Sequence, residues 1–452
     1  MTGSPAAGPT AISPFLDGNY APIAEERTCR ELTVSGRLPA ALSGRYLRTG
    51  PNPLAAPSPP HHWFLGDGMI HSIALDGGRA REYRNRWVRV DAVADALGEA
   101  RRGGPTQPMY DSSNTNVAAF GGRVLSFTEG CYPYLLDDAL DTLGRVDFGE
   151  PLLHGMTAHP KVDPVTGELH AFSYWWVEPY LLYHRISADG QLVETVAIDL
   201  PAPVSMHDFA ITEGHIVFFD QPAVFNLQAA VETGFPFRWA PDNGARVGLL
   251  PRGAGADAIR WIDAPLGYSF HPMNAYEVDD TLQVDVPLTS SAYAGDRLGP
   301  GDDDWLGLQR WSIDLTTGRL DVELIDELAQ EFCRVRDDRI GRPHRFGYTI
   351  ELGRDMPYDG TRVFKQDLVA GTRSEHDFGP ANHPGEFVFV ADPDRPGDED
   401  GGWLLGVVHP DGEERAVLTV LDAQDVAAAP VAEVHIPVRV PYGFHGNWVP
   451  DA

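Results

Sequence analysis

The sequence predicts an all-β fold, and among all-β folds it favours a β-propeller of about seven blades. Three observations predict it. Hairpin signatures recur, in which two short β-prone runs flank a tight turn that contains Gly or Asp. Helical periodicity is scarce, while 47 glycines and 38 prolines are spread over all 452 residues. Between Asp76 and Gly214 the turns come at intervals of roughly 25 to 45 residues, which suits four-stranded sheets repeated around an axis.

Each of these turns is expected to join two neighbouring strands. Gly and Asp suit such turns because they tolerate the positive φ angles that tight hairpins need. In chain order the turns are expected at Asp76–Gly77, Gly121–Gly122, Thr166–Gly167, Asp189–Gly190, Glu213–Gly214, Asp279–Asp280, Thr317–Gly318 and Asp411–Gly412.

The chain is expected to form a single domain, residues 1–452, in which residues 1–40 are an N-terminal extension. A pair of β-sandwiches is the structural alternative, but no linker rich in Pro, Ser and Gly divides the chain. Two regions interrupt the β pattern. Residues 221–250 are apolar and contain the one predicted helix, around Phe225 to Thr233; they form either an insertion packed on the propeller or an entrance for a hydrophobic substrate. Residues 91–115 are polar and are expected to form a loop.

Composition argues against several classes of function. Acidic side chains outnumber basic ones by 65 to 35, which gives a formal net charge of -30 and argues against nucleic acid or an anionic membrane as an electrostatic partner. The N-terminus lacks the basic and apolar parts of a secretory signal, and no apolar run approaches the roughly 18 residues that span a bilayer. We therefore expect a cytoplasmic protein. Cys29, Cys131 and Cys333 lie far apart and are expected to be reduced thiols.

The 16 histidines fall into two groups. Most lie in polar or turn contexts and are expected at the surface; these include His61, His62, His184, His215, His376 and His409. Four others have apolar or small neighbours and are followed at once by Pro, Asp or Gly: His159 in MTAHPKVDP, His207 in VSMHDFAIT, His271 in YSFHPMNAYE and His445 in YGFHGNWVP.

The separations within the second group, 48, 64 and 174 residues, place its members on different blades if a blade takes about 50–60 residues. Because innermost strands converge on the axis of a propeller, the four imidazoles are candidates for one metal site. Imidazole suits Fe, Zn, Cu and Ni. Four separate, hydrogen-bonded core histidines remain the alternative, since spacing alone is a weak test.

Ordered blocks over almost the whole chain resemble the carotenoid cleavage oxygenase family. The resemblance runs from about Gly50 to the C-terminus. The blocks that carry it are GPNP (50–53), HWFLGDGMIHSI (62–73), YRNRWVR (83–89), NTNV (114–117), TEGCYPYLLD (128–137), AHPKVDPVTGELHAFSY (158–174), MHDFAIT (206–212), FHPMNAYE (270–277), EFCRV (331–335), GRPHRFGY (341–348), GEFVFVADP (385–393), DEDGGWLL (398–405) and PYGFHGNWV (441–449).

The resemblance implies a seven-bladed propeller with a helical dome over an axial iron, Fe(2+). It implies that His159, His207, His271 and His445 are the iron ligands. It further implies that three glutamates, Glu129, Glu331 and Glu386, hydrogen-bond the outer N–H of ligand imidazoles, and that the methyl of Thr115 crowds one open iron position. Taken singly, each glutamate is more simply a surface carboxylate, and only the family motifs distinguish these three. The aromatic residues Trp63, Phe64, Phe270 and Trp448 flank the motifs and line either a substrate tunnel or the propeller core.

The implied activity is a non-heme iron dioxygenase that cleaves a conjugated C=C bond with O2 into two carbonyl products. We expect an apocarotenoid-like polyene as substrate. The alternative is a stilbene or phenylpropanoid alkene of the lignostilbene or isoeugenol type, but the stilbene branch carries a Lys directly before its first glutamate and this chain has Thr128. A retinoid-isomerase-like activity and a non-catalytic propeller that serves as an interaction platform are further alternatives. No obligate protein partner is expected, and the apolar segment 225–239 is expected to make at most a weak hydrophobic contact with a membrane.

Overall fold

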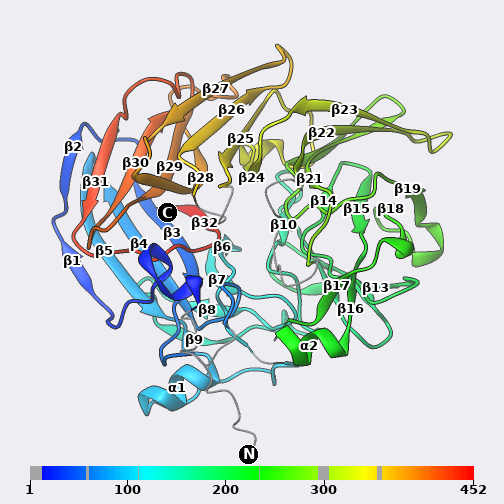
Figure 1. Ribbon diagram of the computed structural model, residues 1–452, viewed down its shortest axis with the longest axis horizontal. Helices are drawn as coiled ribbons and strands as arrows, with labels where there is room; N and C mark the ends of the chain where they lie inside the picture. The colour runs from blue at the N-terminus through cyan, green and yellow to red at the C-terminus, as the bar shows by residue number, and fades with distance from the viewer. Residues whose placement is uncertain are drawn as a thin grey trace, which may run out of the picture.

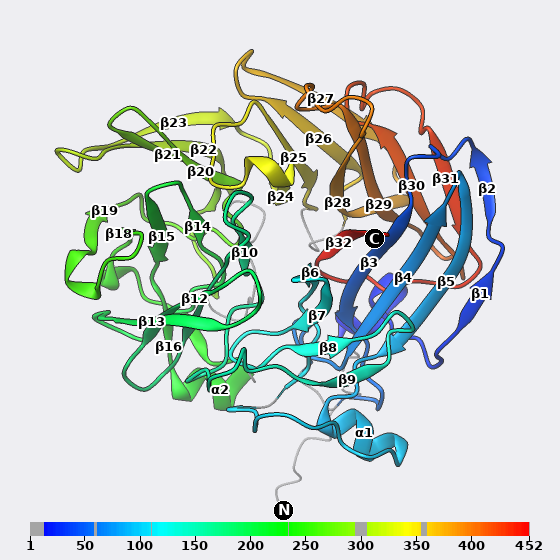
Figure 2. The same cartoon turned by 180° about the vertical axis from the view of Figure 1, so that it is seen from behind.

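The structure is a computed structural model of the chain, and it describes residues 13–57, 61–109, 111–233, 235–293, 305–353 and 359–451. Residues 1–12 of the expected extension and Gly234 of the apolar insertion lie outside the described residues. Seven antiparallel sheets of four or five strands are arranged around a central axis within this part of the chain (Figures 1 and 2). The predicted all-β, seven-bladed propeller is therefore confirmed.

Five blades follow one another along the chain as four-stranded sheets, and in each of them the strands lie side by side in chain order. The blades are β6 (Asn116–Phe120), β7 (Arg123–Phe127), β8 (Tyr134–Leu136) and β9 (Thr142–Arg145); β10 (Lys161–Val162), β11 (Leu169–Tyr174), β12 (Leu181–Ile186) and β13 (Leu192–Ile198); β14 (Ala210–Ile211), β15 (His215–Asp220), β18 (Arg246–Pro251) and β19 (Arg260–Asp263); β20 (Asn274–Val278), β21 (Thr281–Thr289), β22 (Trp305–Asp314) and β23 (Leu320–Asp326); and β24 (Gln330–Arg334), β25 (Phe346–Glu351), β26 (Arg362–Asp367) and β27 (Thr372–Asp377).

The two remaining blades close the ring because each combines strands from both ends of the chain. One contains β28 (Asn382–Ala391), β29 (Gly402–Pro410), β30 (Ala416–Asp422), β31 (Ala432–Ile436) and β2 (Thr33–Gly36); the other contains β32 (Gly446–Pro450), β3 (Gly44–Pro51), β4 (Gly68–Asp76), β5 (Arg79–Trp87) and β1 (Thr28–Arg30). Tyr46 pairs with Trp448 in the second of these sheets. The ring is thus held shut by backbone hydrogen bonds between residues about four hundred positions apart.

The predicted turns each join two paired strands. The turn at Gly121 and Gly122, for example, joins β6 to β7, and both glycines have a positive φ (56° and 71°). The apolar core lies mainly between neighbouring blades. One cluster joins Tyr46 and Ile73 to Leu405 and Val434 across the closing blades.

Packing between β3 and the chain just before β32 explains two glycines, one in the block GPNP and one in the block PYGFHGNWV. Gly50 in β3 lies so close to Gly443 that a Cβ added at Gly50 would come within 2.4 Å of the Gly443 Cα. Neither position has room for a side chain. The segment that carries His445 can therefore pack directly against β3.

The polar region 91–115 contains a short helix that the sequence prediction missed. The helix α1 (Asp91–Leu97) ends at Gly98, which adopts the left-handed conformation with φ 69°. Val93 is buried in a cluster that also contains Val88 and Val117. The expectation of a loop was wrong because this seven-residue helix is stabilised by packing against two blades and not by its own periodicity.

Two histidines expected at the surface are instead fully buried. His184 in β12 is hydrogen-bonded through Nδ1 to the Thr195 hydroxyl at 2.9 Å. His409 in β29 lies between the Val440 carbonyl (2.9 Å from Nδ1) and Arg48 (2.7 Å from Nε2). Their polar sequence contexts were misleading because the blades bury polar side chains that find hydrogen-bond partners across neighbouring strands.

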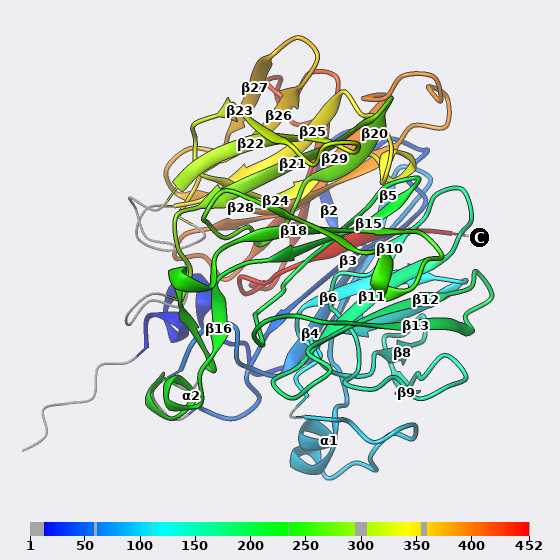
Figure 3. The ribbon, with the colours of Figure 1, turned by 90° about the vertical axis from the view of Figure 1, so that its right-hand side faces the viewer.

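The apolar insertion lies between β15 and β18. It contains the two-stranded sheet β16 (Ala223–Phe225) and β17 (Phe237–Trp239), with the predicted helix α2 (Leu227–Thr233) between them. The other described helical turns are 3₁₀ segments: Pro14–Leu16, Gly18–Tyr20, Pro241–Asn243, Ala256–Ala258 and Asp337–Arg339. The side view places α2 and β16 on the face opposite to the C-terminus (Figure 3). Within the described residues, every helix is too short or too polar to cross a lipid bilayer.

Candidate metal centre

The innermost strands of the seven blades each place one predicted site residue near the propeller axis. We call the group formed by these residues and Glu129 the hub. The residue stands just before its strand or within it. These residues and strands are Thr115 before β6, His159 before β10, His207 before β14, His271 before β20, Glu331 in β24, Glu386 in β28 and His445 before β32. Glu129 differs, since it follows β7, the second strand of its blade. Residues spread over 331 positions of the chain therefore meet at one place because the propeller converges there.

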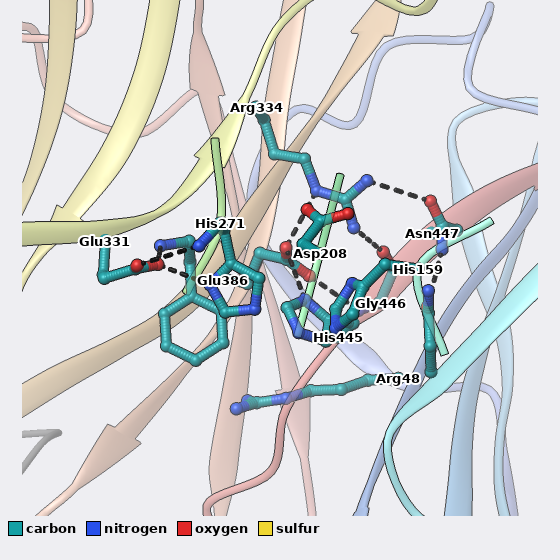
Figure 4. A network of polar contacts seen from close by, with 12 residues as sticks. Arg48, His159, Asp208, His271, Glu331, Arg334, Glu386, His445, Gly446 and Asn447 are labelled. Atoms are coloured by element: carbon teal, nitrogen blue, oxygen red, sulfur yellow. Dashed lines mark hydrogen bonds and ion pairs between the residues drawn. The ribbon is translucent and has the colours of Figure 1, made fainter. Parts of the chain in front are cut away.

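Four imidazoles meet at the axis. One ring nitrogen from each of His159, His207, His271 and His445 lies within 4.8 Å of every other. The Nε2 atom of His207 is 3.0 Å from the Nε2 atoms of both His159 and His271. Figure 4 shows His159, His271 and His445 together in the close-up of this hub. Apart from His207, which is half-buried, the four side chains are buried.

This cluster fits a metal ion of the kind that imidazole prefers. Two nitrogens that each lie about 2.1 Å from an ion are about 3.0 Å apart when they subtend a right angle, and about 3.4 Å apart at a tetrahedral angle. The observed 3.0 Å separations match the right angle. An octahedral ion with four imidazole ligands keeps open positions, whereas structural zinc is usually tetrahedral and closed.

Three glutamates hold the outer nitrogens of these imidazoles. Glu331 Oε2 lies 2.5 Å from His271 Nδ1, and Glu386 Oε1 lies 3.0 Å from His445 Nδ1. Glu129 makes the corresponding ion pair with His207 Nδ1. A carboxylate at Nδ1 keeps the proton on that nitrogen and leaves the Nε2 lone pair free for an ion.

His159 differs from the other three imidazoles. Among the described residues it forms no ion pair with a carboxylate. The segment of His159 is held instead through its backbone. The backbone N–H of His159 donates to the Thr157 hydroxyl at 3.0 Å, and the Asn116 side-chain amide donates to the carbonyl of the preceding Ala158 at 2.8 Å.

Burial keeps two of the imidazoles uncharged. It lowers the pKa of His445 to about 3, and burial together with the neighbouring imidazoles holds the pKa of His159 well below its usual range. For His207, burial alone would lower the pKa, but the Glu129 carboxylate outweighs it and raises the pKa. Neutral imidazole is the form that binds a metal, so His159 and His445 are ready to bind at neutral pH.

Both glutamates on innermost strands lie at β-bulges. The register of β24 against β25 shifts between Glu331 and Arg334, and Phe332 within this bulge has a φ of 55°. The register of β28 against β29 shifts between Pro384 and Phe387, on either side of Glu386. A bulge turns a side chain away from the regular alternation of a strand. These bulges accompany the carboxylates that contact the imidazoles.

The structure adds two residues that the sequence analysis missed. The Tyr174 hydroxyl donates to Glu129 Oε2, and the Arg334 Nε donates to Glu386 Oε1 at 2.8 Å. Burial alone would raise the pKa of Glu386, but Arg334 and His445 outweigh it and hold this pKa well below its usual range, so the carboxylate stays ionised. Tyr174 and Arg334 lie inside the sequence blocks that carry the family resemblance, but nothing local distinguishes them from other core residues.

Thr115 lies next to the imidazole cluster through its backbone, since its carbonyl accepts the His445 N–H at 3.2 Å. Its hydroxyl donates to Asn114 Oδ1 at 3.0 Å and lies 3.4 Å from the Thr128 hydroxyl. Asn114 is held in turn, because its amide donates to the carbonyls of Phe64 and Gly66. The hydroxyl of Thr115 is therefore occupied by neighbours on its own blade and in the adjoining loop.

Aromatic rings cover part of the hub. The ring centre of Phe270 lies 5.5 Å from that of His207, and the ring centre of Phe332 lies 5.4 Å from that of His271. Phe64 contacts Phe270, and Trp63 packs on Phe444. Trp448, by contrast, packs in the core between the closing blades. Of the four flanking aromatic residues, Phe270 is the one in ring contact with a hub imidazole.

Comparisons with known proteins agree over nearly the whole chain. Residues 20–450 match the family described as Retinal pigment epithelial membrane protein. A carotenoid cleavage oxygenase of Mycobacterium tuberculosis is 39% identical, with 97% of this chain and 98% of that protein covered. A carotenoid 9,10(9',10')-cleavage dioxygenase of Phaseolus vulgaris is 32% identical, with 97% and 89% covered.

Three solved structures show the same fold. The lignostilbene dioxygenase of Pseudomonas brassicacearum superimposes with a TM-score of 0.89 at 28% identity, covering 98% of this chain and 100% of that one. A variant of the Synechocystis apocarotenoid oxygenase superimposes with a TM-score of 0.85 at 27% identity, covering 96% and 98%. A cobalt-substituted form of the Synechocystis enzyme is also similar, with a TM-score of 0.84. From its sequence and its fold, the chain belongs to the carotenoid cleavage oxygenase family and is a dioxygenase of that family.

Proposed function

We propose that the protein binds Fe(2+) through His159, His207, His271 and His445 and cleaves a conjugated C=C bond of an apocarotenoid-like polyene with O2 to give two carbonyl products. The observation that carries this proposal is the meeting of four imidazole nitrogens within 4.8 Å at the hub. The 39% identity to a carotenoid cleavage oxygenase supports the substrate class. When bound, ferrous iron would supply the O2 chemistry of the reaction.

The three glutamates orient the ligands and do not bind the ion themselves. Each holds a proton on Nδ1 of one imidazole, which fixes the ring and makes Nε2 more basic. Three carboxylates also offset the positive charge of a divalent ion that has only neutral ligands. No side chain at the hub needs to act as a general acid or base in this proposal.

Thr115 limits access to the ion. Its hydroxyl is engaged by Asn114 and Thr128, which leaves its methyl group as the part of the side chain that is not hydrogen-bonded. In the proposal this methyl crowds one open metal position, and O2 and the alkene use the space that remains. Phe270 and Phe332 provide apolar surface beside the imidazoles, which suits a hydrophobic alkene and excludes water.

A stilbene-type alkene is the second candidate substrate. The TM-score of 0.89 with a lignostilbene dioxygenase favours it. Thr128 argues against it, because a threonine hydroxyl lacks the charge that an ammonium group brings to a phenolate oxygen. The TM-score measures similarity of the whole propeller, whereas Thr128 lies directly before Glu129 at the hub. The residue at the site therefore weighs more, and we favour the polyene.

A panel of alkenes tests the proposal. Purified protein loaded anaerobically with Fe(2+) is mixed in air with apocarotenals, resveratrol and isoeugenol, and the products are identified by mass. We expect about one iron per chain and two carbonyl fragments from an apocarotenal. Protein that holds no iron and consumes no alkene would favour a non-catalytic propeller, and a product of unchanged mass would indicate isomerisation.

Replacing Thr128 with lysine is expected to shift the preference toward hydroxystilbenes. A charged hydrogen bond to a phenol oxygen contributes about 1.5–3 kcal/mol, so resveratrol cleavage should rise about ten- to a hundredfold relative to apocarotenal cleavage. The ratio of kcat/KM values measures the shift. Thr128→Met is the control, since it has similar reach and no charge. An equal change in both variants would show that size and not charge is responsible.

We also propose a cytoplasmic protein that makes weak peripheral contact with membranes through segment 225–239. Leu227 and Val231 on α2 are 70% and 82% exposed, and a net charge of -30 makes such contact hydrophobic. Val231→Glu is expected to reduce sedimentation with neutral phosphatidylcholine vesicles severalfold. Val369→Glu is the matched control, because Val369 is 77% exposed on a different blade. Equal sedimentation of the two variants would contradict the contact.

A further inference from the structure

The three carboxylates at the hub differ in their second partner. Glu129 accepts the Tyr174 hydroxyl, and Glu331 accepts the backbone N–H groups of Phe332 and His271. Both sets of partners are uncharged. Glu386 instead accepts from the guanidinium of Arg334, in addition to the Gly446 N–H at 2.7 Å.

Arg334 and His445 compete for the same oxygen. The Arg334 Nε lies 2.8 Å from Glu386 Oε1, and His445 Nδ1 lies 3.0 Å from that same atom. The equivalent distance between Glu331 and His271, where no guanidinium intervenes, is 2.5 Å. Charge-assisted donors bind a carboxylate more strongly than neutral ones. His445 therefore shares its carboxylate with a cation and receives less negative charge than His271 does.

The other donors of Arg334 connect three innermost strands (Figure 4). Nη2 donates to the Gly446 carbonyl at 2.7 Å, and Nη1 lies 3.3 Å from Asn447 Oδ1. The Asn447 amide donates to the Val117 carbonyl at 2.8 Å and to Asn116 Oδ1 at 3.2 Å. The Asn116 amide in turn reaches the Ala158 carbonyl. A continuous chain of hydrogen bonds thus runs from Arg334 past His445 to the residue before His159.

The net charge of the side chains that hydrogen-bond the hub imidazoles and their carboxylates also has a simple value. Three carboxylates and one guanidinium carry a net charge of −2, which balances a divalent ion held by neutral imidazoles. Asp208, next to His207, is neutralised separately by Lys161 at 2.8 Å. Arg48 lies nearby, where its guanidinium contacts His409 and the Gly443 carbonyl. Without Arg334 the hub would carry one excess negative charge.

We propose that Arg334 is a positioning residue for the metal site. Through Glu386 it sets the charge on His445, and through Asn447 it links the His445 segment to the His159 segment. The site therefore favours a divalent over a trivalent ion. The inference rests on the proposed iron site. Removing the guanidinium leaves an uncompensated carboxylate, which stabilises ferric iron relative to ferrous iron and lowers the reduction potential.

Charge and geometry are separated by two substitutions. Arg334→Gln removes the charge, and we expect a lower midpoint potential of the bound iron and at least about a tenfold slower cleavage. Arg334→Lys keeps the charge but cannot reach Glu386, Gly446 and Asn447 together. We expect it to retain the parent potential while cleaving more slowly. The potential is measured by the ferric electron paramagnetic resonance signal at defined potentials, and thermal unfolding of the metal-free protein monitors the fold.

Arg246→Gln is the matched control. Arg246 pairs with the buried Asp220 on the two middle strands of one blade, and its side chain is 28% exposed, compared with 24% for Arg334. It should leave the potential unchanged. If Arg334→Gln fails to fold, Glu386→Gln provides the opposite test, because it removes a negative charge, leaves Arg334 in place and should raise the potential.

The result that would overturn the inference is a potential that stays at the parent value in Arg334→Gln, or in Glu386→Gln if that variant has to be used. An equal shift in Arg334→Gln and Arg246→Gln would also overturn it, since the effect would then be general. A parent protein without iron contradicts the proposed function instead, so the two failures can be distinguished.

Discussion

Replacing His271 with alanine is expected to abolish iron binding and alkene cleavage together. His271 contributes one of the four nitrogens that meet at the hub, and its Nε2 lies 3.0 Å from that of His207. Its loss also leaves the buried Glu331 without its imidazole partner. Because loss of an outer carboxylate alone typically costs 10–100-fold in metal affinity, loss of a ligand should cost more than about a hundredfold. Iron per chain and kcat/KM for an apocarotenal measure the effect.

His215→Ala is the control for this substitution. His215 Nδ1 bonds Glu277 Oε1 at 2.8 Å, so the same kind of pair is broken, but on β15 and away from the hub. The control should keep its iron and its activity. Unchanged iron and unchanged cleavage in the His271 variant would refute the assignment of the ligands.

Replacing Glu331 with glutamine is expected to weaken metal binding about 10–100-fold while leaving the fold intact. The amide oxygen can still accept the proton on His271 Nδ1, but the negative charge that makes Nε2 basic is lost. Glu331 is 4% exposed, and the new NH2 group faces the His271 backbone N–H that Oε1 accepts at 3.2 Å, so a modest loss of thermal stability is also expected. Competition with a chelator measures the affinity, and thermal unfolding of the metal-free protein measures stability.

Glu277→Gln is the matched control, since Glu277 holds His215 in the same way outside the hub. Its metal affinity should equal that of the parent. If the Glu331 variant bound iron as tightly as the parent, an orienting carboxylate would not be needed at His271. A large loss of thermal stability in that variant alone would indicate a structural role in β24 instead.

The geometry of the hub suggests why a propeller suits this chemistry. Every blade contributes to the hub, yet no two of the four imidazoles come from the same blade. Each imidazole stands just before an innermost strand that is hydrogen-bonded into its own sheet. Each ligand therefore lies within three residues of a strand that its sheet holds in place, which favours a preorganised site.

Much of the fold was predictable from the sequence because its signals are local. A turn such as Asp76–Gly77 needs only its own residues and their short flanking strands to form, so its position can be read directly. The four histidines were also recognisable, since each stands in a short motif beside apolar residues. The helix α1 and the buried His184 were missed, because burial of Val93 and of His184 depends on neighbouring strands that the local sequence does not reveal.

Local patterns in the sequence favoured a ring of short antiparallel sheets and marked the four histidines, and the family resemblance implied the three glutamates. Which of these side chains meet, and what supports them, became known only from the packed ring. Tyr174 reaches Glu129 across 45 residues, and Arg334 reaches Glu386 across 52. Such contacts depend on the register of one blade against the next and on the bulges that redirect single side chains. Both arise from packing over the whole ring, which no local pattern of residues encodes.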